Sequence, residues 1–184
     1  MDPKTGTHEP VLLGPNDGTL PWTRSCFVCG EKNPRGFRVR SRVEGNKVVI
    51  SYTPVESDVG WRRIVHGGIG MVLMDEVMTW AAMIVAKGAC VAAEVTSRLK
   101  RPIRVGDPMR VEGWVTKATS RLFITESRVV GVHGDVLCEA SGKYVPMASD
   151  ELASCVEDFV ANQDTLDVAG LWAGTGKARG GTGT

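Results

Sequence analysis

The sequence predicts an α+β fold in which an antiparallel sheet of about six strands wraps around one long central helix. Residues 67–87 are apolar, lack proline and have the length of a long globular helix. Runs of alternating apolar and polar residues precede and follow this stretch, which is typical of half-buried strands. Because only one long helix is available to cover the sheet, we expect the sheet to curve around it.

The helix carries a conspicuous acidic pair. Between Gly67 and Ala86 the only ionisable residues are Asp75 and Glu76. A helix that is apolar on nearly every side is buried on nearly every side, and an uncompensated carboxylate there costs on the order of several kcal/mol. Neighbouring side chains diverge by about 100° on a helix, so the two acids face different surroundings. We interpret Glu76 as an ion-pair partner and Asp75 as the acid that faces a site.

The strands follow from turn residues between alternating runs. Gly45-Asn46 separates the two strands of a first hairpin, and a loop of residues 54–65 leads to His66. Gly88 is predicted to end the helix as a C-cap. The predicted strands span residues 37–44, 47–53, 89–101, 109–119, 122–132 and 136–147. We expect an irregular extension at residues 1–25, one domain at 26–147, and a short helix with a flexible Gly/Thr tail at 148–184.

Bulk composition narrows the classes of function. The 184 residues contain 22 basic and 21 acidic side chains, which argues against a nucleic-acid partner and a polybasic membrane anchor. The acidic pair argues against a membrane-spanning helix, and the N-terminus lacks a signal-peptide core. Five cysteines, an odd number, indicate free thiols in a reducing compartment. We therefore expect a cytoplasmic protein with no nucleic-acid or membrane partner.

The CxxC pair, Cys26 and Cys29, invites a zinc or redox interpretation. The sequence shows no second CxxC or Cys/His pair with ligand spacing, so a structural zinc would lack half of its ligands. No βαβ pattern supports a thioredoxin-like site. We interpret the pair as small buried thiols and expect no metal.

Three motifs carry a resemblance to a known family. The segment HGGIGMVLMD, from His66 to Asp75, resembles the motif of hotdog-fold acyl-CoA thioesterases of the PaaI type. The segment KRPIRVGD, from Lys100 to Asp107, is similar to the one that leaves the long strand after the helix in that superfamily. The segment CFVCGEKNPRGF resembles the N-terminal signature of one subgroup. Their order is that of the family.

This resemblance implies a hotdog fold and hydrolysis of acyl- or aryl-CoA to free acid and CoA. It implies a homodimer or a dimer of dimers with active sites between the two helices. The acid in the Asp75 position acts as nucleophile or general base, and the Gly67 N–H polarises the thioester carbonyl. The N-terminus of a helix suits this role because its N–H groups are unpaired and its dipole favours negative charge. No cofactor is expected, since coenzyme A is part of the substrate.

Further site residues are expected around this pair. Gly68 lets substrate approach the backbone closely, and His66 either orients the loop or transfers a proton. Relatives often carry polar side chains where this chain has Gly60 and Ala92, so water could instead be held by other groups. The remaining candidates are Trp61, Glu94 and Thr96 in the cleft, and Arg62, Arg63, Arg101 and Arg104 for the phosphates of coenzyme A.

Two alternatives stay open. The polar residues missing at Gly60 and Ala92 would suit a non-catalytic acyl-CoA-binding or regulatory protein. A hotdog dehydratase or hydratase needs a histidine paired with an acid, and the sequence offers no clear pair. Nothing in the sequence specifies the acyl group, its length or the pathway.

Overall fold

The computed structural model describes residues 11, 16–160 and 162–173. Its main feature is a seven-stranded antiparallel sheet with the order β1-β3-β4-β8-β9-β10-β7. These strands are β1 (Gly18–Thr19), β3 (Arg42–Glu44), β4 (Lys47–Tyr52), β7 (Cys90–Leu99), β8 (Met109–Ala118), β9 (Phe123–Gly131) and β10 (Val136–Pro146). The predicted α+β fold is confirmed, and the two-residue β1 adds a strand that the sequence did not indicate.

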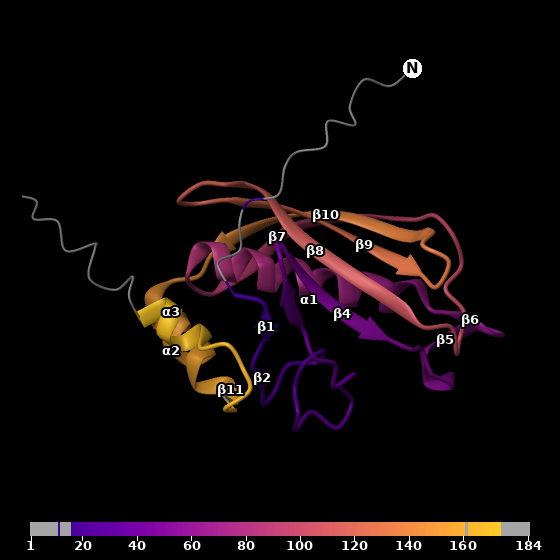
Figure 1. The fold of residues 1–184 in the computed structure, drawn as a ribbon, viewed down its shortest axis with the longest axis horizontal. Helices are drawn as coiled ribbons and strands as arrows, with labels where there is room; N and C mark the ends of the chain where they lie inside the picture. Colours follow the sequence, from indigo (N-terminus) through magenta and orange to yellow (C-terminus); the bar gives the residue numbers. More distant parts are fainter. Residues whose placement is uncertain (1–10, 12–15, 161, 174–184) are drawn as a thin grey trace, which may run out of the picture.

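Helix α1 (Gly67–Ala86) packs along one face of the sheet, which curves around it (Figure 1). Met74, Val77 and Met78 are fully buried against the strands. By length and composition α1 could cross a membrane, but more than half of its most apolar window is buried inside the fold. The helix is therefore apolar because it packs in the core of the fold.

The C-cap of the helix lies one residue earlier than predicted. Lys87, and not Gly88, adopts the left-handed conformation, with φ of 52°. The Gly88 N–H donates to the Met83 carbonyl at 3.2 Å, which satisfies a C-terminal helix carbonyl. The C-cap is therefore Lys87, and the prediction that Gly88 takes this position was wrong.

The predicted loop before α1 contains local structure. It holds the short helix η1 (Glu56–Asp58) and a hairpin of β5 (Val59–Trp61) and β6 (Ile64–Val65). Asp58 is buried and accepts a hydrogen bond of 2.6 Å from the Tyr52 hydroxyl. These contacts fix the chain as it enters α1.

The first and last described segments of the chain meet beside α1. β2 (Trp22–Thr23) pairs with β11 (Phe159–Val160), which lies between α2 (Ser149–Asp158) and α3 (Val168–Ala173), as Figure 1 shows at the lower left. Phe159 stacks on Trp80 of α1 with ring centroids 5.6 Å apart. The prediction that residues 18–23 belong to an irregular extension was therefore wrong, because they contain β1 and β2. The predicted Gly/Thr tail from residue 174 onward lies outside the described residues.

Candidate active site

Asp75 is half-buried in the middle of α1 and is held by a tyrosine. The Tyr144 hydroxyl donates a hydrogen bond of 2.6 Å to Asp75 Oδ1. Tyr144 lies on β10 and is fully buried. Burial, and then the neighbouring carboxylate of Asp75, raise the pKa of Tyr144. The phenol therefore stays protonated and orients the carboxylate. Sequence reasoning missed Tyr144, because it occupies an ordinary core position of an alternating strand.

Glu76 faces a different part of the molecule, as predicted for adjacent helix residues. Its Oε1 accepts a hydrogen bond of 2.9 Å from Trp80 Nε1, and its Oε2 lies 3.8 Å from Cys26 Sγ. Burial, followed by the charge of Cys26, raises the pKa of Glu76 to about 7. The expected ion pair is absent from the described residues, so that interpretation of Glu76 was wrong.

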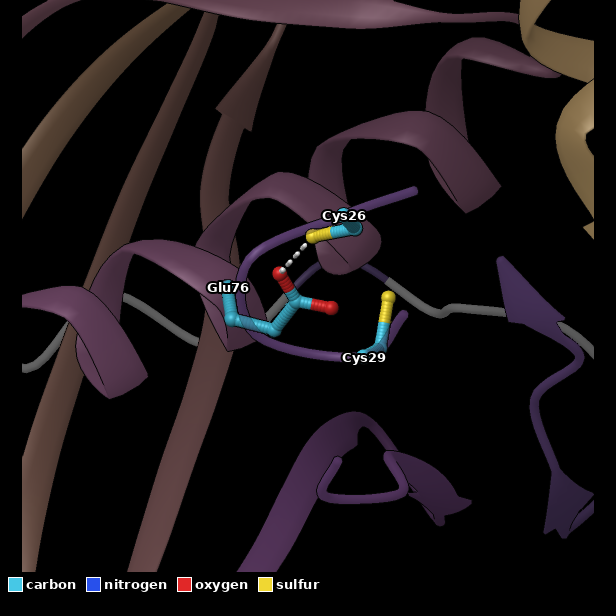
Figure 2. A group of neighbouring side chains, drawn as sticks. All are labelled: Cys26, Cys29 and Glu76. Atoms are coloured by element: carbon cyan, nitrogen blue, oxygen red, sulfur yellow. Dashed lines mark hydrogen bonds between the residues drawn. The ribbon is translucent and has the colours of Figure 1, made fainter. Parts of the chain in front are cut away.

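The two cysteines of the CxxC motif lie beside the Glu76 carboxylate (Figure 2). Cys26 is half-buried and Cys29 is buried. A hydrogen bond with the Cys29 thiol lowers the pKa of Cys26 to about 6, while the same contact raises the pKa of Cys29. The pair is thus buried against an acid on α1, which the spacing in the sequence could not reveal.

The first turn of α1 presents one open backbone donor. His66 is the N-cap, and its Nδ1 accepts a hydrogen bond of 3.0 Å from the Gly68 N–H. The Ile69 N–H donates to the His66 carbonyl at 2.9 Å. Within the described ranges nothing accepts a hydrogen bond from the Gly67 N–H. His66 therefore orders this turn, and Gly67 keeps a donor available for a ligand.

A pocket of about 330 Å³ opens beside that donor. Gly67, Leu99 and Arg101 lie in its wall. A Cβ added at Gly67 would lie 2.7 Å from Leu99 Cδ1, so the glycine lets the Leu99 side chain pack closely on the first turn of α1. The pocket combines apolar walls, one backbone donor and a cationic rim, which suits an acyl thioester with an anionic tail.

Gly67 and Asp75 cannot act on one carbonyl within a single chain. They are eight residues apart on one helix, which corresponds to roughly 12 Å along its axis. A catalytic acid and an oxyanion donor must both lie within hydrogen-bond reach of the reacting group. A site that uses both groups therefore needs two copies of the chain.

Two predicted cleft residues lie on the wrong face of the sheet. The register pairs Glu94 with Lys143, and Thr96 with Ser141, whereas Tyr144 pairs with Ala92. Since Tyr144 points toward α1, Glu94 and Thr96 point to the outer face. Glu94 also forms an exposed ion pair of 2.8 Å with Lys143. Both residues are therefore separated from Asp75 by the sheet.

The remaining predicted residues are spread over the loops beside the α1 N-terminus. Trp61 is 74% exposed on the hairpin that also carries Arg62 and Arg63. Gly60 packs so closely on His66 that an added Cβ would lie 2.8 Å from the His66 Cα. Arg101 lies 3.4 Å from Asp135, and Arg104 is exposed. Of these four arginines, Arg101 lines the pocket beside Gly67, and Gly60 only supports the backbone before α1.

No histidine of the described residues is paired with an acid. His66 bonds to the Gly68 N–H, and His133 lies exposed in the turn between β9 and β10. A hydratase or dehydratase would need such a pair as its acid–base couple. The arrangement therefore does not favour that alternative.

Comparison with known proteins finds a family model that matches part of the chain. Residues 63–138, which include α1, Asp75 and the segment after β7, match the family model of the thioesterase superfamily. Among curated proteins, none matches this sequence.

Solved structures share the fold. A thioesterase superfamily protein is 24% identical with a TM-score of 0.62, and the match covers 66% of this chain and 63% of the other, less than two thirds of its length. PaaI of the phenylacetic acid degradation operon of E. coli is 20% identical with a TM-score of 0.55, covering 60% and 78%. The protein smu.793 of Streptococcus mutans, bound to acetyl CoA, is 13% identical with a TM-score of 0.53, covering 56% and 82%.

Proposed function

Because this chain has the hotdog fold and a segment of the thioesterase superfamily, we propose that it is an acyl-CoA thioesterase. It hydrolyses acyl- or aryl-CoA thioesters to the free acid and CoA. The observation that carries the proposal is the Gly67 N–H, unpaired in the described part of the chain, beside a pocket at the start of α1. The CoA-bound state of the S. mutans neighbour supports the substrate class.

The reaction follows from the groups at the site. Asp75 of the partner subunit takes a proton from water, whose oxygen attacks the thioester carbon. The negative charge that develops on the carbonyl oxygen is stabilised by the Gly67 N–H and the helix dipole. Collapse of the intermediate breaks the C–S bond, and the thiolate of CoA receives the proton. In the covalent variant the Asp75 carboxylate attacks the thioester carbon and expels the thiolate of CoA, and water then hydrolyses the resulting anhydride to the free acid and the Asp75 carboxylate.

The proposal includes a homodimer, or a dimer of dimers, in the cytoplasm. The site needs two chains, because Gly67 and Asp75 lie too far apart on one helix. β7 forms one edge of the sheet, and Val95 and Leu99 are exposed on it. An unpaired edge with apolar side chains favours pairing with a second copy. Arg62, Arg63, Arg101 and Arg104 then bind the phosphates of coenzyme A.

The test is turnover of short, long and aromatic CoA esters by the wild type and by Asp75→Asn. We expect free thiol from the wild type and a loss of kcat on the order of 10³-fold or more in the variant. Undiminished hydrolysis by Asp75→Asn would remove Asp75 from the mechanism. The variant's thermal midpoint and dimer mass serve as controls for folding.

A second candidate is an acyl-CoA-binding protein without turnover. It is favoured by Ala92, which pairs with Tyr144 on the side of the sheet that faces α1 and places a methyl group there. Binding of a non-hydrolysable CoA thioether, together with no turnover of any ester, would select this candidate. Restoring a hydroxyl with Ala92→Ser would then raise hydrolysis only if water positioning is what is missing.

A further inference from the structure

A second pocket lies along α1 beside Glu76 and belongs to a different set of residues from those at Gly67. It has a volume of about 510 Å³ and is bounded by the CxxC loop, α1 and the C-terminal segment. Cys26, Cys29 and Glu76 converge in its wall, as Figure 2 shows. The proposed thioesterase chemistry uses none of the three.

The three side chains are spaced like ligands of one small cation. Their ligand atoms, two sulfurs and one carboxylate oxygen, all lie within 4.8 Å of one another. Cys26 Sγ is 3.8 Å from Glu76 Oε2. In a tetrahedral zinc site, Zn–S bonds of about 2.3 Å and Zn–O bonds of about 2.1 Å place neighbouring ligand atoms roughly 3.5–3.8 Å apart. Small side-chain rotations therefore close the set around a metal ion.

The backbone of the CxxC loop holds the first sulfur in place. The Val28 N–H donates to Cys26 Sγ at 3.3 Å, and the Gly30 N–H donates to the Cys26 carbonyl at 3.0 Å. A Cβ at position 30 would lie 2.2 Å from that carbonyl oxygen, so the turn requires its glycine. Backbone N–H groups aimed at sulfur stabilise the thiolate that a metal needs.

The carboxylate is oriented in the same way. Trp80 Nε1 donates to Glu76 Oε1 at 2.9 Å, which leaves Oε2 turned toward the sulfurs. Metal-ligating carboxylates are commonly fixed by such an outer hydrogen bond. The indole is itself fully packed, stacked on Phe159 of β11.

The charge of the pocket favours a cation over a redox dithiol. Among the described residues that line it, three are acidic, namely Glu76, Glu157 and Asp158, and none is basic. Reactive dithiols sit in electropositive surroundings, which stabilise the attacking thiolate. Two sulfurs and a buried carboxylate without a basic neighbour are instead compensated by a bound positive ion.

We propose that Cys26, Cys29 and Glu76 bind one thiophilic divalent cation, with Zn²⁺ the best match, whose fourth position opens to this pocket. Binding forms two metal–sulfur bonds and one metal–oxygen bond, and it releases the thiol protons to solvent without any oxidant. The ion ties the loop before β3 to the middle of α1. A water or a small ligand from the pocket completes the tetrahedron.

The experiment loads the full-length, reduced protein with Zn²⁺ or Co²⁺ after treatment with a chelator. We expect one metal per chain by elemental analysis, and a thiolate-to-cobalt charge-transfer band. Cys26→Ser and Glu76→Gln weaken binding by about 100-fold or more, and Trp80→Phe by about 10–100-fold. Cys155→Ser is the matched control, because Cys155 lines the same pocket but is not among the three ligands.

A second measurement avoids dependence on variants that fail to fold. In the wild type, bound Zn²⁺ protects Cys26 and Cys29 from alkylation, as measured by mass spectrometry, and leaves Cys155 as reactive as before. The proposal is overturned if the reduced protein binds no Zn²⁺, or if Cys155→Ser loses as much affinity as Cys26→Ser. It is also overturned if mild oxidation joins the two cysteines and Zn²⁺ does not prevent it. Hydrolysis of acyl-CoA bears on neither result.

Discussion

The contact between Tyr144 and Asp75 is the residue-scale feature with the largest consequence for activity. A carboxylate on an apolar helix can rotate, and a single short hydrogen bond selects one orientation of it. The donor comes from β10, so the sheet positions the acid that α1 carries. Tyr144 is therefore a positioning residue for the proposed reaction.

Replacing Tyr144 by Phe tests that role. We expect kcat to fall on the order of tenfold or more, because the carboxylate loses its orientation, while KM changes little. Tyr52→Phe is the matched control, since Tyr52 donates a bond of the same length to Asp58, away from Asp75. Steady-state kinetics of both variants make the comparison. Equal losses of kcat in the two would show that only the stability of the fold was affected.

Glu112 controls the response of stability to acid. It is buried on the outer face of β8 and contacts Lys47, Arg110 and Arg128 at 2.9, 3.0 and 2.8 Å. Burial opposes ionisation, but the hydrogen bonds from these three cations lower the pKa of Glu112 from 4.5 to about 2. A depressed folded-state pKa stabilises the fold above the ordinary value, and this contribution is lost as pH falls toward 2.

We therefore expect Glu112→Gln to lower the free energy of unfolding near neutral pH by about 3 kcal/mol. The difference from the wild type shrinks as pH falls from 4.5 to about 2, since the wild-type side chain then also becomes neutral. Urea unfolding at several pH values measures this. Glu94→Gln, which removes one exposed ion pair, should change little at any pH. A pH-independent difference would contradict the assignment.

At the scale of elements, the packing of α1 on the sheet depends on a glycine in β8. A Cβ at Gly113 would lie 2.7 Å from Val77 Cγ2 and 2.9 Å from the Val77 backbone carbon. The helix backbone cannot retreat without lifting the buried side chains around it, because protein interiors are close-packed. Gly113 thus sets how near α1 comes to the sheet.

Gly113→Ala should therefore destabilise the protein by about 1–3 kcal/mol, the usual range for an overpacked core. Gly88→Ala, just beyond α1, is the control, because an added Cβ there meets nothing within 4 Å. Thermal unfolding followed by circular dichroism compares the two. A Gly113→Ala protein as stable as the wild type would mean that α1 moves freely on the sheet.

The elements also explain which parts of the site the sequence could predict. The helix and strands follow from local patterns of apolar residues, so residues 67–87 and the hairpin at Gly45 agree closely with α1 and the β3–β4 turn. A register shift between β7 and β10 pairs Tyr144 with Ala92 and leaves Ala93 without a partner. Simple alternation puts Ala92 on the same face as Glu94 and cannot anticipate such a bulge, which turns Ala92 toward α1 and leaves Glu94 on the outer face.

Contacts between distant segments could not be predicted from the sequence, because the prediction uses only local patterns of residues. Cys26 and Glu76 are 50 residues apart, and nothing in either local pattern indicates that they meet. Tyr144 and Asp75 are 69 residues apart, and a tyrosine in a strand is ordinary core. His66 and Asp75, in contrast, belong to one continuous segment that begins at the N-cap of α1, so their spacing follows directly from the sequence.

At the scale of the whole molecule, the proposed activity depends on a second chain, and edge strand β7 is where we expect it to pair. Val95 is 36% exposed near the middle of β7, so Val95→Asp should place a charge in the interface, and burying that charge opposes association. Light scattering should show a shift from dimer to monomer at micromolar concentration, and hydrolysis should fall with the dimer fraction. Val132→Asp is the matched control, because Val132 is 58% exposed in the turn after β9. A folded Val95→Asp monomer with full activity would contradict a site shared between Gly67 and Asp75 of different chains.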